Sequence, residues 1–150
     1  MKILLQRVSS AKVEIGGEIA GAVGSGYLAL VGCHTGDTPE NADKLAAKTV
    51  ALRVFEDEGG KMNRSIADTG GSVLAVSQFT LYADTRKGNR PSFVDAGDPA
   101  AASALYDRYC ARLREALGPD RVATGRFGAD MRVSLVNEGP CTIELRSEQE

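Results

Sequence analysis

The sequence is poor in the side chains that build most hydrolytic sites. Its 150 residues include one histidine, three cysteines and no tryptophan, and aromatic residues make up 5%. It has no His pair and no C-x-x-C spacing, which argues against a zinc site. It also lacks a G-x-S-x-G elbow, a P-loop and a G-x-G-x-x-G turn between a strand and a helix. An enzyme of this sequence must therefore use hydroxyls, amides and backbone groups, and we expect no metal or other cofactor.

The sequence also lacks a charge excess and a long apolar run. Its net charge is −2, whereas proteins that coat duplex nucleic acid are usually basic overall. The N-terminal MKILLQRVSS has no signal-peptide core, and no apolar run approaches the roughly 18 residues of a membrane span. Cys33, Cys110 and Cys141 are odd in number and lie in apolar stretches, which predicts buried free thiols. We expect a cytoplasmic protein with no membrane partner and one domain over residues 1–150.

Hydrophobic periodicity predicts an α+β fold, in which a mostly antiparallel or mixed, barrel-like sheet carries two main helices. Proline and glycine signals place one helix at residues 37–55 and a second between Asp98 and Gly118. Asp37 or Thr38 can cap the first helix, and Glu40 has the spacing to complete a capping box with Asp37. The expected strands cover residues 2–15, 18–23, 27–33, 72–82, 122–124, 132–136 and 141–146.

Two connections between these elements stand out. Residues 56–71 are polar and glycine-rich, with room for a short hairpin. Gly139-Pro140 separates the last two expected strands, where Asn-Gly or Asp-Gly would be the commoner hairpin turn. Proline has no backbone N–H to give to a strand pair. The pair is either an ordinary turn or a rigid piece of backbone displayed for contact with another group.

Polar residues interrupt the apolar strand at SQFTLYAD, residues 77–84. On a strand, Ser77 and Phe79 face one side, and Gln78 and Thr80 face the other. An amide and a hydroxyl would then stand two residues apart on one face. This arrangement suits either a solvated strand face or a strand end that lines a polar pocket.

Two loops also have compositions typical of binding sites. Arg86, Lys87 and Arg90 lie close to Phe93 in one loop, a combination that suits a phosphate backbone and a base, or simply a solvated loop. In GRFGADM, residues 125–131, two glycines allow a close approach of the backbone, and Met131 is an adaptable apolar group. A β-bulge with a core methionine explains that second pattern equally well.

Five stretches together resemble one family, the D-aminoacyl-tRNA deacylases. SQFTL at Ser77–Leu81 and N-x-G-P-x-T at Asn137–Thr142 are similar to its two signature motifs. QRV at Gln6–Val8, KGNRPSF at Lys87–Phe93 and G-x-F-G-A-x-M at Gly125–Met131 match in the same order. The resemblance covers nearly the whole chain. One departure is Cys141, where the family usually has Val.

The resemblance implies a cytoplasmic homodimer that hydrolyses the ester between a D-amino acid, or glycine mischarged on alanine tRNA, and tRNA. It implies a cis Gly139-Pro140 that enters the active site of the other subunit and blocks L-amino acids there, with Arg7 helping to hold it. A clash of this kind rejects the wrong enantiomer without added affinity for the right one. Substrate would be bound by Met131, Asn137, Gly139, Pro140 and Arg7, and tRNA by Arg86, Lys87 and Arg90.

The chemistry is assigned to Ser77, Gln78, Phe79 and Thr80. A threonine nucleophile needs a base, and the sequence shows none. We therefore expect the ribose 2′-OH to assist water, and backbone N–H groups near Phe79 and Thr80 to stabilise the oxyanion. Two other readings stay open: an RNA-binding module without turnover, and a small-molecule esterase that uses Thr80 and His34.

Overall fold

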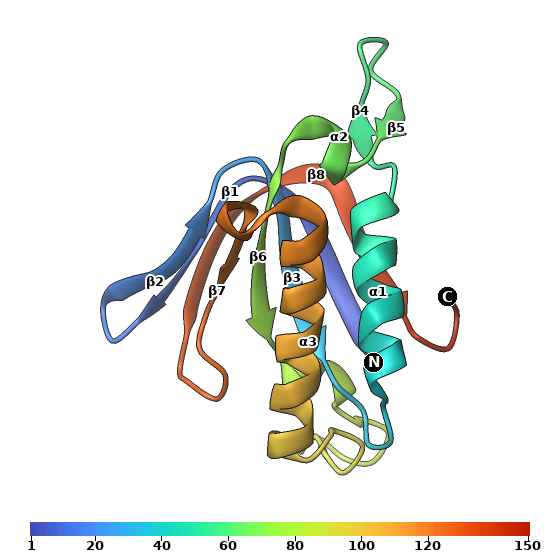
Figure 1. Ribbon diagram of the computed structural model, residues 1–150. Helices are drawn as coiled ribbons and strands as arrows, with labels where there is room; N and C mark the ends of the chain where they lie inside the picture. Colours follow the sequence, from blue (N-terminus) through green and yellow to red (C-terminus); the bar gives the residue numbers. More distant parts are fainter.

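The computed structural model describes residues 1–150, and its centre is a mixed six-stranded sheet (Figure 1). Five strands lie in the order β2-β1-β3-β6-β7, and β8 pairs with β1 off this path. Because β1 pairs with three strands, the sheet curls until it is nearly closed into a barrel. The α+β prediction is confirmed. The strands of this sheet are β1 (Lys2–Ile15), β2 (Glu18–Val23), β3 (Gly26–Gly32), β6 (Ser72–Ser77), β7 (Val122–Thr124) and β8 (Arg132–Arg146).

The continuous apolar run of β3 is explained by its central place in the sheet. It pairs antiparallel with β1 and parallel with β6, and both of its faces are covered. Tyr27, Ala29 and Val31 point into the larger of two cores, whereas Leu28 points into the smaller one inside the curled sheet. A strand between two such cores needs apolar residues at every position, as the sequence indicated.

Two helices, α1 (Pro39–Ala51) and α3 (Pro99–Leu117), lie side by side across one face of the sheet (Figure 1). The predicted inner face of α3 is buried along its length. The Thr49 hydroxyl of α1 and the Tyr109 hydroxyl of α3 are 2.9 Å apart, so the buried polar groups at the helix contact satisfy each other. No helix is long and apolar enough to cross a membrane. Cys33, Cys110 and Cys141 are buried free thiols, as predicted.

The first helix begins at Thr38, one of the two predicted caps, but its capping box and its end differ from the prediction. Thr38 is its N-cap, and the Thr38 N–H donates to Asn41 Oδ1 at 2.9 Å. Asp37 does not cap it because its carboxylate accepts from the Met1 ammonium at 2.7 Å and from the His34 N–H at 2.6 Å. The helix ends at Ala51 rather than residue 55, because the following residue is already extended.

The polar segment between α1 and β6 contains the short hairpin for which the sequence had room. Its strands are β4 (Phe55–Glu56) and β5 (Met62–Arg64), and the four-residue helix α2 (Ile66–Thr69) follows. The hairpin projects from one end of the molecule (Figure 1). A short 3-10 helix, η2 (Pro119–Arg121), leads from α3 into β7.

The predicted strand over residues 72–82 is wrong in its second half. β6 ends at Ser77, and residues Phe79–Tyr82 form a 3-10 helix, η1. The Gln78 N–H still donates to the Val31 carbonyl at 2.7 Å, but β3 ends at Gly32. No neighbouring strand continues beyond this point, so the chain turns across the end of β3.

The two predicted strands at the C-terminus are one strand. β8 runs through Gly139-Pro140 without turning, and it pairs with β1 on both sides of the pair. The register shifts between Gln6 and Val8, and the residues on β8 opposite this point bulge out of the ladder. A bulge accommodates proline because the missing N–H is not needed there. Gly139-Pro140 is therefore not a hairpin turn.

Candidate active site

A cavity of about 700 Å³ opens where β3 and β6 end. Its walls come from the start of α3, the loop before β8 and the segment after η1. Twelve of its nineteen lining residues are hydrophobic, and a few polar groups stand among them, as is usual in ligand sites. Ser77, Gln78, Phe79 and Met131 all line this cavity, so the structure brings together four of the predicted site residues.

The turn η1 presents free backbone N–H groups beside the cavity. The first internal hydrogen bond of η1 runs from the Leu81 N–H to the Gln78 carbonyl, at 3.2 Å. The N–H groups of Phe79 and Thr80 precede it, so neither has an acceptor within the turn. Both residues are exposed. Phe79 lines the cavity, whereas Thr80 is not among the lining residues and stands next to it along the turn. Two adjacent donors that are unpaired within the turn are suited to binding a negatively charged oxygen.

Gln78 and Thr80 lie together, but not for the predicted reason. They do not share a strand face; the turn brings the Gln78 amide nitrogen against the Thr80 hydroxyl, to which it donates. His34 does not reach Thr80. Its ring packs on Tyr82 at 5.1 Å between centroids, and it is not among the lining residues. Thr80 thus lacks the base that a nucleophilic hydroxyl needs.

The cysteine at the cavity is not a nucleophile either. Cys33 lines the cavity, but burial, aided by the nearby Asp37, raises the pKa of its thiol to about 11. The thiol is therefore protonated near neutral pH, and the thiolate is the reactive form. No group of three or more His, Cys, Asp or Glu side chains is arranged to hold a metal ion.

Gly125 lets the Met131 side chain pack closely at the cavity. A Cβ atom on Gly125 would lie 2.5 Å from the Met131 sulfur, so a side chain there would force this flexible thioether to move. The contact supports the interpretation that the glycines near Phe127 permit a close approach. The segment is a loop rather than a β-bulge.

The remaining predicted substrate residues form a second group at the bulge of β8. The peptide bond between Gly139 and Pro140 is cis, and both residues are exposed. The buried Arg7 guanidinium donates to the Glu138 carbonyl at 3.2 Å and to the Val54 carbonyl at 2.6 Å. In the orientation that satisfies its amide, Asn137 donates to the carbonyls of Arg7 and Cys141, both at 3.2 Å.

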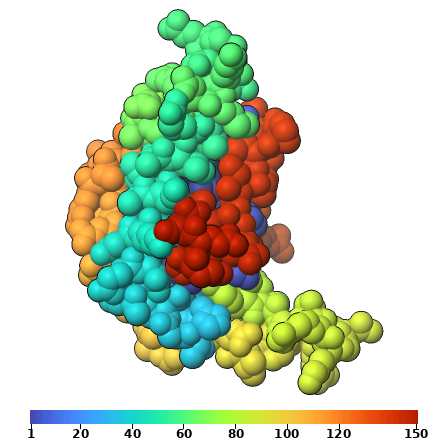
Figure 2. Space-filling view, turned by 90° about the vertical axis from the view of Figure 1, so that its right-hand side faces the viewer, coloured from blue at the N-terminus to red at the C-terminus, as the bar shows by residue number.

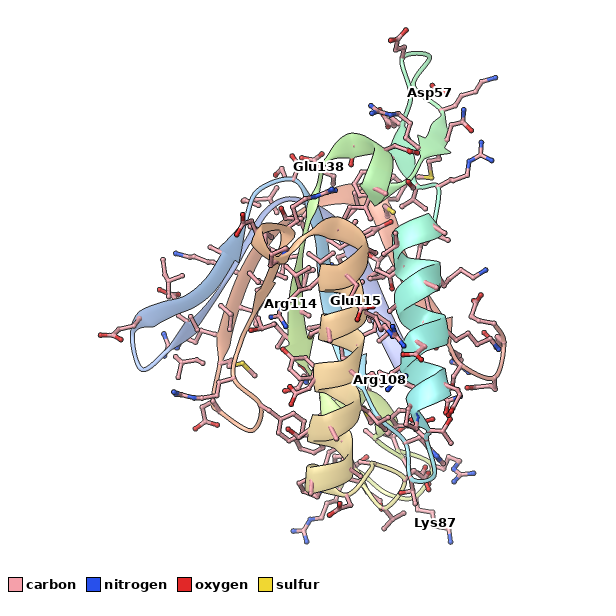
Figure 3. The ribbon with its side chains drawn as sticks, in the orientation of Figure 1. Asp57, Lys87, Arg108, Arg114, Glu115 and Glu138 are labelled. Atoms are coloured by element: carbon pink, nitrogen blue, oxygen red, sulfur yellow. The ribbon has the colours of Figure 1, made fainter.

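This second group lies far from the cavity of its own chain. Arg7 pairs with Tyr27 at the start of β3, whereas the cavity begins at Val31. Four residues along the strand and three strand spacings from β8 to β6 amount to about 20 Å. In Figure 3, Glu138, next to Gly139, lies in the upper part of the molecule, and Lys87, in the loop that follows η1, lies at the lower end.

The basic loop protrudes beside the cavity end of the molecule (Figure 2). Arg86 is held by Asp84, with two side-chain hydrogen bonds of 2.8 and 2.6 Å, and this pairing lowers the pKa of Asp84 to about 2. Lys87 and Arg90 are exposed and form no ion pair. Of the three predicted cations, these two are free to meet a phosphate.

Comparisons with known proteins identify the family. The model of the family described as D-Tyr-tRNA(Tyr) deacylase matches residues 4–146. The chain belongs to the D-aminoacyl-tRNA deacylase family. A D-aminoacyl-tRNA deacylase of Azoarcus sp. is 56% identical, and the match covers 97% of this chain and 95% of the Azoarcus chain. That of Bacillus pumilus is 54% identical over 99% of this chain and 100% of its own. The prediction of an enzyme of this hydrolase family is confirmed.

Two solved structures share the fold of this deacylase-family chain. One, titled c-Myc DNA Unwinding Element Binding Protein, has a TM-score of 0.92 and 41% identity, and covers 97% of this chain and 98% of its own. The other, described as a probable eukaryotic D-amino acid tRNA deacylase, has a TM-score of 0.82 and 18% identity, and the match covers 96% of this chain and 98% of that chain. At this identity the likeness supports only the fold.

Sequence reasoning missed part of the cavity lining. Tyr106 and Ala102 reach the cavity from α3, and the carboxylates of Asp98 and Asp130 stand at its wall. Asp98 is occupied as the N-cap of α3, where it accepts from the Ala101 N–H at 3.1 Å. Asp130 had a local signal, its position inside GRFGADM. The α3 residues had none, because their spacing is that of an ordinary buried helix face.

Proposed function

We propose that this chain hydrolyses the ester of D-aminoacyl-tRNA and of glycyl-tRNA mischarged on alanine tRNA, and that it does so as a cytoplasmic homodimer. The observation that carries the proposal is the cavity at the end of β6, beside which η1 presents the N–H groups of Phe79 and Thr80. An ester carbonyl placed there would develop its negative charge against two fixed donors. Family membership supplies the substrate class.

The chiral filter of this proposal is Gly139-Pro140 from a second copy. Within one chain the pair lies about 20 Å from the cavity, so it cannot close its own site. Its exposure and its support by Arg7 suit a firm projection that enters a partner. Backbone pressed against the α-carbon would clash with an L side chain and tolerate a D side chain. Glycine has no side chain to exclude, so its ester is cleaved too.

The proposed hydrolysis is assisted by the substrate. The 2′-OH of the terminal ribose orients or activates the attacking water, since Thr80 has no base beside it and its hydroxyl is occupied by Gln78. Water adds to the ester carbonyl, the oxyanion forms at the N–H groups of η1, and the 3′-oxygen leaves with a proton. Free amino acid and tRNA are the products.

The proposed contact with tRNA is small. Lys87 and Arg90 contact backbone phosphates near the 3′ end, and the exposed rings of Phe79 and Phe93, 5.1 Å apart, provide a surface for a base. A short basic loop on a chain of net charge −2 fits recognition of one end of a tRNA better than a broad RNA surface.

A mixing experiment tests whether the filter acts between subunits. Pro140→Gly removes the ring at the tip of the projection but leaves the chain's own cavity intact. Phe79→Pro removes one N–H donor from the cavity but keeps a normal Gly139-Pro140. We expect Pro140→Gly alone to release both D- and L-tyrosine from tRNA. When Pro140→Gly is refolded with an excess of the Phe79→Pro chain, most Pro140→Gly subunits should form mixed dimers. In a mixed dimer the active cavity of the Pro140→Gly subunit receives the normal Gly139-Pro140 of its partner, so the ratio of L to D cleavage should fall.

The ratio is the informative quantity, because an excess of inactive chain that merely sequesters tRNA slows both reactions equally. An L-to-D ratio that stays constant at every excess of the Phe79→Pro chain would contradict a filter supplied by the partner. Excess wild-type chain serves as the matched control for exchange when the absolute rate of L cleavage is followed, since its own D activity changes the ratio without exchange.

A further inference from the structure

A lysine at the start of β1 contacts the C-terminal half of η1, the turn whose Phe79 and Thr80 N–H groups are proposed to bind the oxyanion. Lys2 Nζ donates to the carbonyl oxygen of Leu81 at 3.3 Å and lies 4.6 Å from the centre of the Tyr82 ring. These are the last two residues of η1. Lys2 forms no ion pair, and its side chain is partly buried, so its ammonium is committed to the turn. A hydrogen bond from a charged donor is stronger than a neutral one, and cation–aromatic contact adds to it.

We propose that Lys2 is a positioning residue for deacylation: through Leu81 and Tyr82 it holds the Phe79 and Thr80 N–H groups where the oxyanion forms. Lys2 does not touch the substrate in this scheme. The proposal rests on the proposed function, because the placement of η1 affects a rate only if the donors of η1 take part in the reaction.

A glycine that faces the same turn supports this role. Gly32 is the cross-strand partner of Lys2, so both residues stand at the same end of the sheet. A Cβ atom on Gly32 would lie 3.0 Å from Leu81 Cβ and 3.1 Å from the Gln78 carbonyl oxygen. The turn therefore rests directly on the backbone of β3. Gly32 sets how close η1 comes to the sheet, and Lys2 ties it down there.

Few hydrogen bonds join the turn to the rest of the molecule, so the one from Lys2 is a large share of them. The other is the Gln78 N–H to the Val31 carbonyl at 2.7 Å, and the rings of Phe79 and Tyr82 pack on Phe93 and His34. The turn has four residues and is anchored internally by two backbone bonds, Leu81 N–H to Gln78 at 3.2 Å and Ala83 N–H to Thr80 at 3.1 Å. None of its residues is buried. In a preorganised site, a misplacement of about 1 Å costs about 100-fold in rate. Losing one tether displaces the donors by part of that distance, so a loss of about tenfold is expected.

The test compares three variants in single-turnover release of D-tyrosine from D-tyrosyl-tRNA. Lys2→Met keeps the apolar stem and loses the charge; Lys2→Arg keeps a cation that can reach the same carbonyl and ring. Lys12→Met, on the same strand, removes a lysine that is likewise partly buried and whose nearest carboxylate contact is 4.0 Å away, and serves as the control. We expect Lys2→Met to lower the saturated rate about tenfold with unchanged half-saturation, and the other two variants to match the wild type.

A second perturbation displaces the same turn from the neighbouring strand, β3. Gly32→Ala should push Leu81 and Gln78 outward by a few tenths of an ångström and also lower the saturated rate with unchanged half-saturation. In both slow variants the amide NMR resonances of Phe79 and Thr80 should shift, and those of Glu138 and Gly139, at the bulge of β8 and remote from Lys2, should stay in place.

The outcomes distinguish the positioning role of Lys2 from the proposed deacylase function on which it rests. If the wild type releases D-tyrosine and Lys2→Met releases it equally fast, the positioning role is refuted and the proposed function stands. A Lys2→Met defect that Lys2→Arg does not rescue, or one that appears only in half-saturation, also refutes it. A wild-type chain that releases no D-tyrosine overturns both proposals.

Discussion

The proposed oxyanion donors can be tested by replacing Phe79 with proline. Phe79 is the first residue of η1, the helical position that proline fits best because its N–H is unused within the helix. The preceding residue, Gln78, has φ −147° and ψ 78°, outside the helical region that proline disfavours for its predecessor. The substitution therefore removes one donor and leaves the turn in place.

Phe79→Pro also removes the aromatic ring, which is 57% exposed and packs edge-on against Phe93. Phe79→Ala is the matched control, since it loses the same ring and keeps the N–H. Removing one donor from a preorganised oxyanion site costs about 2.7–4 kcal/mol, or roughly 100- to 1,000-fold in rate. We expect Phe79→Pro to be slower than Phe79→Ala by a factor in this range.

The assay is single-turnover release of D-tyrosine from tRNA with enzyme in excess, which isolates the chemical step from product release. Circular dichroism and thermal unfolding establish that both variants are folded. If folded Phe79→Pro cleaves as fast as Phe79→Ala, the Phe79 N–H does not stabilise the transition state, and the proposed mechanism loses one of its two donors.

Three further predictions concern other parts of the structure. Thr80→Ala should keep most of the deacylation rate, because the hydroxyl has no base; a folded variant slowed by several orders of magnitude would make Thr80 a nucleophile. A lysine in place of Arg7 cannot donate to the carbonyls of Val54 and Glu138 at once. Arg7→Lys should therefore lower the free energy of unfolding by about 2 kcal/mol and raise the rate of L-ester cleavage. Arg146→Lys is the control and should change neither quantity. Asp43 accepts hydrogen bonds from Arg108 and Arg112, which hold the pKa of its carboxyl far below the usual range. A lowered carboxyl pKa stabilises the fold above the unfolded pKa of about 4, and this contribution is lost as pH falls, so the urea midpoints of wild type and Asp43→Asn should converge between about pH 5 and pH 2.

The local signals in the sequence predicted much of the fold. Gly16 and Gly17 both have positive φ, which explains why this pair could be recognised as the turn between β1 and β2. Asp98 before Pro99 gave the start of α3, and Gly118 gave its end. Each signal depends on the conformational limits of one or two residues, so no knowledge of distant contacts was needed.

Errors arose where a distant segment decides the local structure. Alternating residues 72–82 continue to resemble a strand, but β6 stops where its neighbour β3 stops. Gly139-Pro140 resembles a turn because two strand patterns flank it, yet both patterns pair with the same strand, β1. Asp37 has the spacing of a helix cap, but its carboxylate instead accepts a hydrogen bond from the Met1 ammonium, 36 residues away. Spacing along the chain does not contain these contacts.

The site was predicted in part for the same reason. Ser77, Gln78 and Phe79 stood out because polar residues follow an apolar strand, and all three line the cavity. The sequence did not reveal that Gly139-Pro140 lies far in space from the cavity of its own chain. That separation follows only from the pairing of β8 with β1 and of β1 with β3. The α3 wall of the cavity was likewise hidden, since Tyr106 reads as an ordinary core residue.

The measurement that tests the central claim most directly is deacylation of the same tRNA carrying D-tyrosine, L-tyrosine or glycine. We expect rapid release from the D and glycyl esters and an intact L ester, because a backbone wedge excludes only an L side chain. Equal cleavage of the D and L esters would leave an esterase without a chiral filter. If all three esters survive while tRNA is bound, the chain is an RNA-binding module and the proposed function is wrong.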